Sequence, residues 1–387
     1  MNSPVVKSPR AIVVGGSLGG LFSANLLRQL GWEVDVYERS AHQLDSRGGG
    51  LVLQPEVVEV FQRLGTGIDR DQLGVRSENR LVISPDGQLA SKYYAPQTQT
   101  SWALVFSTLR QWLGAERYHQ GKSLSRIEQQ PDGVTAFFDD GSSDRADLLI
   151  GADGGNSMVR QLLWPEAEVH YAGYFVWRGL IPETAMSPLA KKMLHGDFAF
   201  ANNTGSHALG YLVPGLKNDL REGHRLYNWV WYRLADDALL ADIMTDLDGR
   251  QRGYFIPEGK LAPKWLPHIH AEAEAMLPQA FVDVIKATPE PFAQAIRDLA
   301  VDSMVSGRVV LLGDAAAIPR PHTGYGSGKA AANALALADA LESYPGDIDL
   351  ALARWQPGQV SLGKSVMNYG IDLGDPLMFN RPARRYG

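Results

Sequence analysis

The sequence predicts an α/β fold with about two domains and a C-terminal helix. A chain of 387 residues is longer than one simple core usually holds. Short apolar strands followed by glycine-rich turns and helices occur near both ends of the chain, which is typical of a parallel sheet with crossover helices. Residues 166–285 are instead rich in aromatic residues in partly alternating runs, which favours an antiparallel sheet.

Composition excludes several classes of function. The net charge is -6 and no basic stretch stands out, so we expect no nucleic-acid partner. The chain has no cysteine, which excludes disulfides, thiolate catalysis and cysteine-based zinc sites. The polar segment MNSPVVKSPR lacks the apolar core of a signal peptide, and no run of about 18 apolar residues occurs. We therefore expect a cytoplasmic protein without a membrane span.

The first motif lies at residues 11–38. Residues 11–14 form a short β-branched strand, VVGGSLGG follows as a turn, and apolar residues at helical spacing continue to Gly31. A second strand over residues 33–38 then ends in an acid, Glu38. This strand–turn–helix–strand–acid order is the Rossmann-like unit that binds dinucleotides.

The turn departs from the usual G-x-G-x-x-G pattern at one position. Gly15 and Gly20 occupy the first and third glycine positions, whereas Ser17 occupies the second. Gly15 permits the tight turn and Gly20 permits close packing of the helix on the strand. Ser17 adds only one small group, and its hydroxyl could donate to a phosphate oxygen. Because Glu38 lies where a carboxylate reaches ribose hydroxyls, we favour a dinucleotide site over an ordinary α/β corner.

Two further motifs follow at a distance. In LLIGADGGNSMVRQLL, a strand at residues 148–150 leads through a turn with Asp153 into a helix. In RVVLLGDAAAIPRPHTGYGSGKAAANALALADAL, a strand at residues 309–312 leads to Gly313 and Asp314, and glycines 324, 326 and 328 precede a helix. Glycines let a backbone pass close to a flat ligand, and a helix N-terminus there offers a positive dipole end.

With these three motifs in this order, the chain resembles the single-component flavin-dependent aromatic hydroxylases, the family typified by para-hydroxybenzoate hydroxylase. The segments GLVLQPEVV, YAGYFVWRGL, YLVPG and GDAAAIPRPH are most similar to the branch that hydroxylates dihydroxypyridines. The resemblance implies FAD as cofactor and NAD(P)H as a transient electron donor. It also implies hydroxylation of an electron-rich hydroxylated aromatic ring with O₂ through a flavin C4a-hydroperoxide.

The resemblance also implies roles for particular residues. Glu38 would bind the adenosine ribose, Asp314 the ribityl chain, and the backbone from Gly324 to Gly328 the isoalloxazine ring. Asp153 and Arg160 would fix FAD and shape the groove for the nicotinamide donor, although acids at such turns also cap helices. The candidate cofactor-binding residues are Gly15, Ser17, Leu18, Glu38, Arg39, Arg110, Asp153, Asp314, Gly324, Gly326, Ser327 and Gly328.

The chain departs from the family pattern at several positions besides Ser17. Phe106 replaces an arginine that binds FAD in many relatives, and Arg110 or Arg47 could substitute for it. Asn333 replaces a frequent aspartate, and Ala317 replaces a frequent histidine. The site for FAD is therefore expected to be complete except at position 106.

Candidate catalytic residues are His322 and Pro321, which precede the flavin-binding glycines. His322 could donate a hydrogen bond to a phenolic or pyridinol oxygen, act as its base, or be structural. Candidate substrate contacts are His322, Tyr211 and Trp229, with Trp231 as a further aromatic, although such aromatics are more often core residues. His268 and His270 lack a carboxylate at metal-binding spacing, so we expect no metal site.

The expected architecture is a Rossmann-like FAD-binding domain, a mainly antiparallel substrate domain and a C-terminal helical segment. We expect the FAD-binding domain to comprise residues 1–75, 101–165 and 286–345, and the substrate domain residues 76–100 and 166–285. The C-terminal segment would comprise residues 346–387. A small aromatic substrate and O₂ are the expected partners, and a homodimer is possible. A hydroxypyridine is the favoured substrate. A phenol or another N-heterocycle, a non-hydroxylating flavin oxidoreductase, and a flavin-binding protein without activity are the alternatives.

Overall fold

The computed structural model describes residues 8–42 and 49–381. A six-stranded, mostly parallel sheet forms one half of the molecule, in the order β17-β18-β10-β1-β2-β6. Its strands are β1 (Arg10–Val14), β2 (Glu33–Glu38), β6 (Tyr118–Gln120), β10 (Leu148–Gly151), β17 (Val305–Ser306) and β18 (Val309–Leu311). The central strands β1, β10 and β18 are almost wholly apolar, because helices bury both faces of a parallel sheet.

Five helices accompany this sheet. They are α1 (Leu18–Gln29), α2 (Pro55–Arg63), α3 (Trp102–Leu113), α4 (Met158–Leu163) and α9 (Gly326–Ser343). Helix α1 packs against α9 and α3, and α2 packs against α9. A three-stranded antiparallel sheet of β7 (Leu124–Gln130), β8 (Gly133–Phe138) and β9 (Ser143–Ala146) completes this half.

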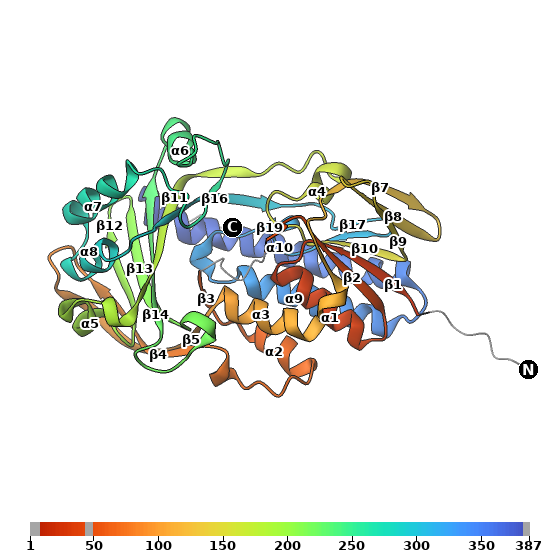
Figure 1. Ribbon diagram of the computed structural model, residues 1–387, viewed down its shortest axis with the longest axis horizontal. Helices are drawn as coiled ribbons and strands as arrows, with labels where there is room; N and C mark the ends of the chain where they lie inside the picture. The colour runs from red at the N-terminus through yellow and green to blue at the C-terminus, as the bar shows by residue number, and fades with distance from the viewer. Residues whose placement is uncertain (1–7, 43–48, 382–387) are drawn as a thin grey trace, which may run out of the picture.

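A ten-stranded sheet dominates the other half, and nine of its strands follow the order β15-β16-β11-β14-β13-β12-β4-β5-β3. They are β3 (Gly50–Val52), β4 (Val75–Ile83), β5 (Leu89–Ser101), β11 (His170–Pro182), β12 (Phe198–Asn203), β13 (Ser206–Val213), β14 (Leu226–Leu234), β15 (Phe255–Ile256) and β16 (Phe292–Ala300). The tenth, β19 (Ala317–Ile318), pairs with β16. Helices α5 (Pro188–Leu194), α6 (Asp237–Ile243), α7 (Trp265–Met276) and α8 (Gln279–Lys286) lie at its outer side (Figure 1).

The long helix α10 (Ile348–Phe379) connects the two halves. It packs against α9 in the first half, and against β16, β13 and the short helix that contains His322 in the second. Figure 1 shows it running through the middle of the molecule, behind the strands that join the two sheets. The C-terminal helix is therefore a central element of the fold.

The predicted fold class is confirmed, and the predicted strands at residues 33–38, 148–150 and 309–312 are present. Three strands from the ranges predicted for the cofactor-binding domain, β3, β16 and β19, belong instead to the ten-stranded sheet. Residues 292–300, for example, form β16, which pairs with β11. Strand pairing across more than a hundred residues leaves no local signal in the sequence, which explains this difference. The domain boundaries themselves stay a prediction.

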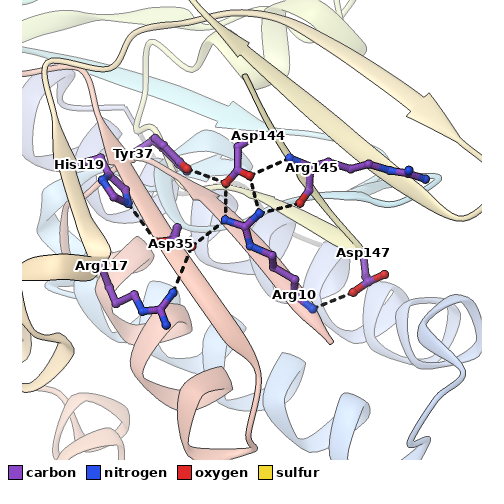
Figure 2. Close-up of polar contacts among 8 residues, drawn as sticks. All are labelled: Arg10, Asp35, Tyr37, Arg117, His119, Asp144, Arg145 and Asp147. Atoms are coloured by element: carbon purple, nitrogen blue, oxygen red, sulfur yellow. Dashed lines mark hydrogen bonds and ion pairs between the residues drawn. The ribbon is translucent and has the colours of Figure 1, made fainter. Parts of the chain in front are cut away.

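A cluster of charged side chains anchors the edge of the Rossmann-like half (Figure 2). Arg10 Nη2 donates to Asp35 Oδ2 at 2.8 Å and to Asp144 Oδ2 at 2.7 Å, and Tyr37 Oη donates to the same Asp144 oxygen at 2.6 Å. His119 Nε2 lies 3.0 Å from Asp35 Oδ1. The cluster thus joins the start of β1, strand β2 and strand β9. It holds β2, and with it the acid at the strand's end, against the sheet.

Candidate active site

The glycine-rich turn after β1 is packed as the motif requires. Gly15 has φ +105°, and a Cβ there would lie 2.4 Å from the carbonyl oxygen of Ala152. A Cβ on Gly20 would lie 1.9 Å from the carbonyl oxygen of Gly15. Ser17 is the N-cap residue of α1, yet its side chain makes no capping hydrogen bond. The Ser17 hydroxyl is therefore free to bond a phosphate oxygen at the positive end of α1.

Glu38 lies beside this turn with its carboxylate buried. Its two oxygens accept hydrogen bonds from the backbone N–H of Gly16 at 2.8 Å and of Ser40 at 2.9 Å. A carboxylate has about four acceptor positions, so both oxygens can still accept from ribose hydroxyls. Leu18 begins α1 and is buried, whereas Arg39 is exposed.

Asp153 caps helix α4. Its carboxylate accepts from Ser157 Oγ at 2.5 Å and from the backbone N–H of Met158 at 2.6 Å. Burial raises the pKa of Asp153, and these hydrogen bonds oppose the rise. Arg160, also buried, donates to the carbonyl oxygens of Ala315 at 2.9 Å and Gly155 at 2.7 Å. Arg160 thus ties the second motif to the third, a connection that the sequence did not reveal.

Asp314 stands at the end of β18 with an exposed side chain. Its Oδ1 lies 2.9 Å from Nζ of Lys329, a lysine that is only 1% exposed. Lys329 is a residue that sequence reasoning missed, although it sits in the quoted third motif. Asn333, which departs from the family pattern, accepts from the backbone N–H of Gly313 at 3.0 Å and so holds the same turn.

The glycine-rich segment before α9 leaves room for a flat ligand. Gly324 has φ +60°, and its carbonyl oxygen accepts from Gln54 Nε2 at 2.7 Å. A Cβ on Gly326 would meet nothing within 4 Å, whereas one on Gly328 would lie 2.8 Å from the ring of Tyr325. Ser327 lies in the first turn of α9. The open backbone at Gly326, the free hydroxyl of Ser17 and the exposed carboxylate of Asp314 fit FAD.

Position 106 holds a phenylalanine where many relatives are expected to have an arginine, and the structure shows the surroundings of Phe106 and of the nearby Arg110. Phe106 is buried and stacks on Trp102, with ring centroids 4.5 Å apart. Arg110 places its guanidinium 4.2 Å from the centre of the Tyr118 ring, and Tyr118 Oη donates to the carbonyl oxygen of Gly16 at 3.0 Å. Arg110 therefore lies next to the dinucleotide turn. Arg47 lies outside the described residues.

His322 contacts side chains on one face of the ten-stranded sheet, two residues before Gly324 of the glycine-rich segment. Its Nε2 lies 2.9 Å from Tyr174 Oη, and its ring centre lies 4.6 Å from Tyr232 and 5.6 Å from His207. Burial lowers the pKa of His207 to about 4, and burial followed by the nearby His207 and Arg320 lowers the pKa of His322 well below its usual value. Both imidazoles are neutral at pH 7.

Tyr211 lies on this same sheet face. A Cβ on Gly50 would lie 2.5 Å from its ring, and the side-chain oxygen of Asn228 accepts from the backbone N–H of Gly50 at 2.9 Å. Burial raises the pKa of Tyr211 to about 12, against the opposing charge of Arg178. Tyr211, Asn228 and Arg178 are therefore gathered where β3 crosses the sheet.

Trp229 and Trp231 lie on the opposite face. Side chains alternate along β14, so Asn228 and Tyr232 face the glycine-rich segment while the two tryptophans face α7 and α8. Trp229 Nε1 donates to Thr288 Oγ1 at 2.7 Å, and Trp231 Nε1 donates to Ser206 Oγ at 2.8 Å. The structure thus places Trp229 on the face of the sheet opposite to Tyr211 and His207, and strand parity of this kind could not be assigned from the sequence.

Pro321 begins a 3₁₀ helix, Pro321–Thr323, next to His322, and its side chain is exposed. Its predicted catalytic role stays a prediction. Within residues 8–42 and 49–381, no group of three or more histidine or acidic side chains could hold a metal ion. Helices long and apolar enough to cross a membrane are likewise absent from the described part of the chain.

Comparison with known proteins defines the class. A family model described as FAD binding domain matches residues 9–208, and one described as FAD binding domain-like matches residues 171–298. Together with the relatives described next, these matches show that the chain belongs to the FAD-dependent monooxygenases and that FAD is its cofactor.

Particular relatives extend this assignment over nearly the whole chain. The 2,6-dihydroxypyridine 3-monooxygenase of Paenarthrobacter nicotinovorans is 34% identical over 93% of this chain and 89% of the relative. The 6-hydroxynicotinate 3-monooxygenase of Pseudomonas fluorescens is 28% identical over 95% and 91%. The solved structure of 2,6-dihydroxypyridine-3-hydroxylase from Arthrobacter nicotinovorans superimposes with a TM-score of 0.91 at 32% identity, covering 98% of this chain and 97% of that one.

Proposed function

We propose that this monooxygenase hydroxylates a hydroxypyridine with NAD(P)H and O₂. The observation that carries the proposal is the group of neutral polar rings that His322, Tyr174, Tyr232 and His207 form beside the glycine-rich segment. Two of the similar proteins are named for hydroxylation of a hydroxypyridine. Bound FAD supplies the redox chemistry, accepting electrons from NAD(P)H and activating O₂.

The protein's own contribution is to bind and orient the ring and to exclude water. The aromatic side chains on this sheet face are buried: Tyr174 is 0% exposed and Tyr232 is 3% exposed. A dry site protects a reactive oxygen species from decay to H₂O₂. Neutral imidazoles and phenols can form hydrogen bonds with a ring oxygen without the cost of burying a charge. His322 and Tyr211 are the proposed substrate contacts.

Turnover with a hydroxypyridine tests the proposal directly. The purified protein should be yellow, and its oxidation of NADH or NADPH should rise at least tenfold when 2,6-dihydroxypyridine is added, with little H₂O₂ released. Comparing NADH with NADPH identifies the donor. A yellow protein that responds instead to a phenol or to another N-heterocycle would overturn the proposed substrate class and keep the enzyme class. No response to any of these would favour a non-hydroxylating flavoprotein.

The homodimer and the cytoplasmic location expected from the sequence also stay proposals. The exposed side chains of Leu89, Tyr93 and Tyr94 on β5 support a homodimer, since exposed apolar residues on one strand favour association. Sedimentation of the holoprotein at micromolar concentration would distinguish a dimer from a monomer.

A further inference from the structure

The hydrogen-bond donors and acceptors around Tyr174 indicate which ring nitrogen of the neutral His322 carries the proton. Tyr174 is fully buried, and its hydroxyl is held against His322 Nε2 at 2.9 Å. Among the described residues, that nitrogen is the one acceptor that the structure places at the Tyr174 hydroxyl. If Nε2 carried a proton, the buried O–H of Tyr174 would be left without an acceptor, which costs about 1–3 kcal/mol. With Tyr174 donating to a bare Nε2, only the Nδ1–H of His322 lacks a partner among the described residues, whereas a protonated Nε2 would leave both the Tyr174 O–H and the Nδ1 acceptor unpaired.

Arg320 strengthens this assignment. Its guanidinium lies 5.5 Å from the centre of the Tyr174 ring. A guanidinium has only donors, so it can give a proton to the Tyr174 oxygen but can take none from it. Its charge and its hydrogen bond to Tyr174 both oppose the rise that burial causes in the pKa of Tyr174. The hydroxyl proton is thus left pointing at His322.

Arg320 is itself fixed by two carboxylates. It is only 5% exposed, and its Nη2 lies 2.8 Å from Asp298 Oδ2 on β16 while its Nη1 lies 2.7 Å from Asp375 Oδ1 on α10. Gly374, the neighbour of Asp375, lets α10 come close: a Cβ there would lie 2.7 Å from Tyr174 Oη and 3.1 Å from His322 Cδ2. The C-terminal helix therefore controls the position of the Tyr174–His322 pair.

With Nε2 occupied, a neutral His322 carries its proton on Nδ1. This Nδ1 is buried and has no hydrogen-bond partner in the described structure. The titratable groups that face His322 are Tyr174 on β11, His207 on β13, Tyr232 on β14 and Arg320 on its own segment. No carboxylate among the described residues pairs with the imidazole itself, so nothing there favours an imidazolium.

We infer that His322 meets the substrate as an Nδ1–H donor to a ring oxygen rather than as a base, and that Tyr174, Arg320 and Asp375 are positioning residues that impose this tautomer. The inference rests on the proposed function. It chooses among the three roles that the sequence left open for His322, namely donor, base and structural residue. It also assigns the site a preference for substrates with an acceptor oxygen, such as a pyridinolate or a pyridone carbonyl.

The tautomer can be measured without turnover. Holoprotein labelled with ¹⁵N-histidine gives distinct shifts for protonated and bare ring nitrogens, and loss of one pair of signals in His322→Asn assigns the residue. The expected result between pH 6 and 8 is a protonated Nδ1 and a bare Nε2, with Tyr174→Phe moving the proton toward Nε2. A protonated Nε2 in the unchanged protein, or an imidazolium, would overturn the inference.

Replacing His322 by asparagine or by glutamine distinguishes a hydrogen-bond donor from a base at this position. An asparagine amide reaches the position of Nδ1, and a glutamine amide reaches that of Nε2. His322→Asn should keep the Kd for 2,6-dihydroxypyridine within about threefold, whereas His322→Gln and His322→Ala should weaken it about tenfold, the loss of about 1.4 kcal/mol. Equal losses in all three variants, with a pH profile that loses its lower limb, would identify a base and overturn the inference.

Two substitutions in α10, one beside Arg320 and one far from it, test the role of the C-terminal helix. Asp375→Asn should weaken substrate binding several-fold and shift the histidine signals, while FAD remains bound. Asp349→Asn, in the first turn of the same helix, removes an exposed ion pair with Arg308 and should change neither. Unchanged ¹⁵N-histidine signals in Asp375→Asn would show that α10 does not position the Tyr174–His322 pair. An unchanged protein with the expected tautomer but no response to hydroxypyridines would instead count against the proposed function alone.

Discussion

Replacing Gly374 by alanine should destabilise the protein, although alanine is the better helix former. Gly374 lies inside α10, where its missing side chain faces the active-site segment. An added Cβ would stand 2.7 Å from Tyr174 Oη, 3.0 Å from Arg320 Nη1 and 3.1 Å from His322 Cδ2. The first of these distances is below any normal contact, so a buried side chain or the helix has to move.

The magnitude follows from opposing terms. Helix propensity favours alanine by about 1 kcal/mol. Overpacking costs about 1–3 kcal/mol, and loss of the Tyr174–His322 hydrogen bond adds about 1 kcal/mol. The net loss in the free energy of unfolding is therefore about 2 kcal/mol. With an unfolding entropy of about 2.1 cal/mol/K per residue, 387 residues give a fall in Tm of roughly 2–3 °C.

Gly358 provides the matched control. It lies in the same helix, and a Cβ there would meet nothing within 4 Å. Gly358→Ala should therefore raise the unfolding free energy by about 1 kcal/mol. Scanning calorimetry of both holoproteins measures the two shifts, and H₂O₂ release per NAD(P)H oxidised should rise only in Gly374→Ala. If both substitutions stabilise the protein equally, α10 is not packed against the active site and the reasoning is wrong.

Three other perturbations probe the cofactor site, the pocket and the charged cluster. Asp314→Ala should yield protein with little flavin absorbance at 450 nm or so, because the exposed carboxylate is the proposed ribityl contact; full FAD occupancy would contradict that role. Lowering the pH from 7 to 5 should cost about 2 kcal/mol of stability through His207, whose pKa falls from 6.5 unfolded to about 4 folded. A histidine whose pKa is lower in the folded state contributes stability at pH values above its unfolded pKa, and the protein loses that contribution as the pH falls. The unfolding free energy of His207→Gln, measured by urea titration at several pH values, should therefore lack this part of the pH dependence. Arg10→Met should lower the free energy of unfolding by about 1–3 kcal/mol and make the protein more sensitive to acid unfolding near pH 4. The reason is that the hydrogen bond and charge of Arg10 oppose the effect of burial and lower the pKa of Asp35. An unchanged midpoint of acid unfolding would count against this.

The cofactor motifs were readable because each is contiguous. Gly15, Ser17 and Gly20 lie within one turn, so backbone geometry and spacing specify their roles directly. Glu38 follows at the end of the next strand, where the βαβ unit brings it back beside the turn. Asp314 follows the strand β18 closely and lies in a short 3₁₀ helix, Gly313–Ala315, twelve residues before the glycine-rich start of α9 at Gly326. Local order along the chain is enough to predict such a site.

The substrate side was not readable in this way. Trp229 and Tyr232 are three residues apart on one strand, and only the pairing of that strand decides which of them faces the pocket. Tyr174 and Arg320 lie within segments that resemble the family, yet nothing in the sequence pairs Tyr174 with His322, or Arg320 with Asp375. Their roles arise from contacts between strands and helices that are far apart in the sequence.

The sequence by itself determined the α/β class, the FAD cofactor and the family, because strand–turn–helix units bind dinucleotides through neighbouring residues. Tertiary structure alone decided that the C-terminal helix packs against the short helix that contains His322 and that the Tyr174 hydroxyl lies at Nε2 of His322. A hydrogen bond between residues 148 positions apart depends on how two sheets and a helix pack. No periodicity in the chain encodes that packing, whereas the folded molecule specifies it through close approach at Gly374.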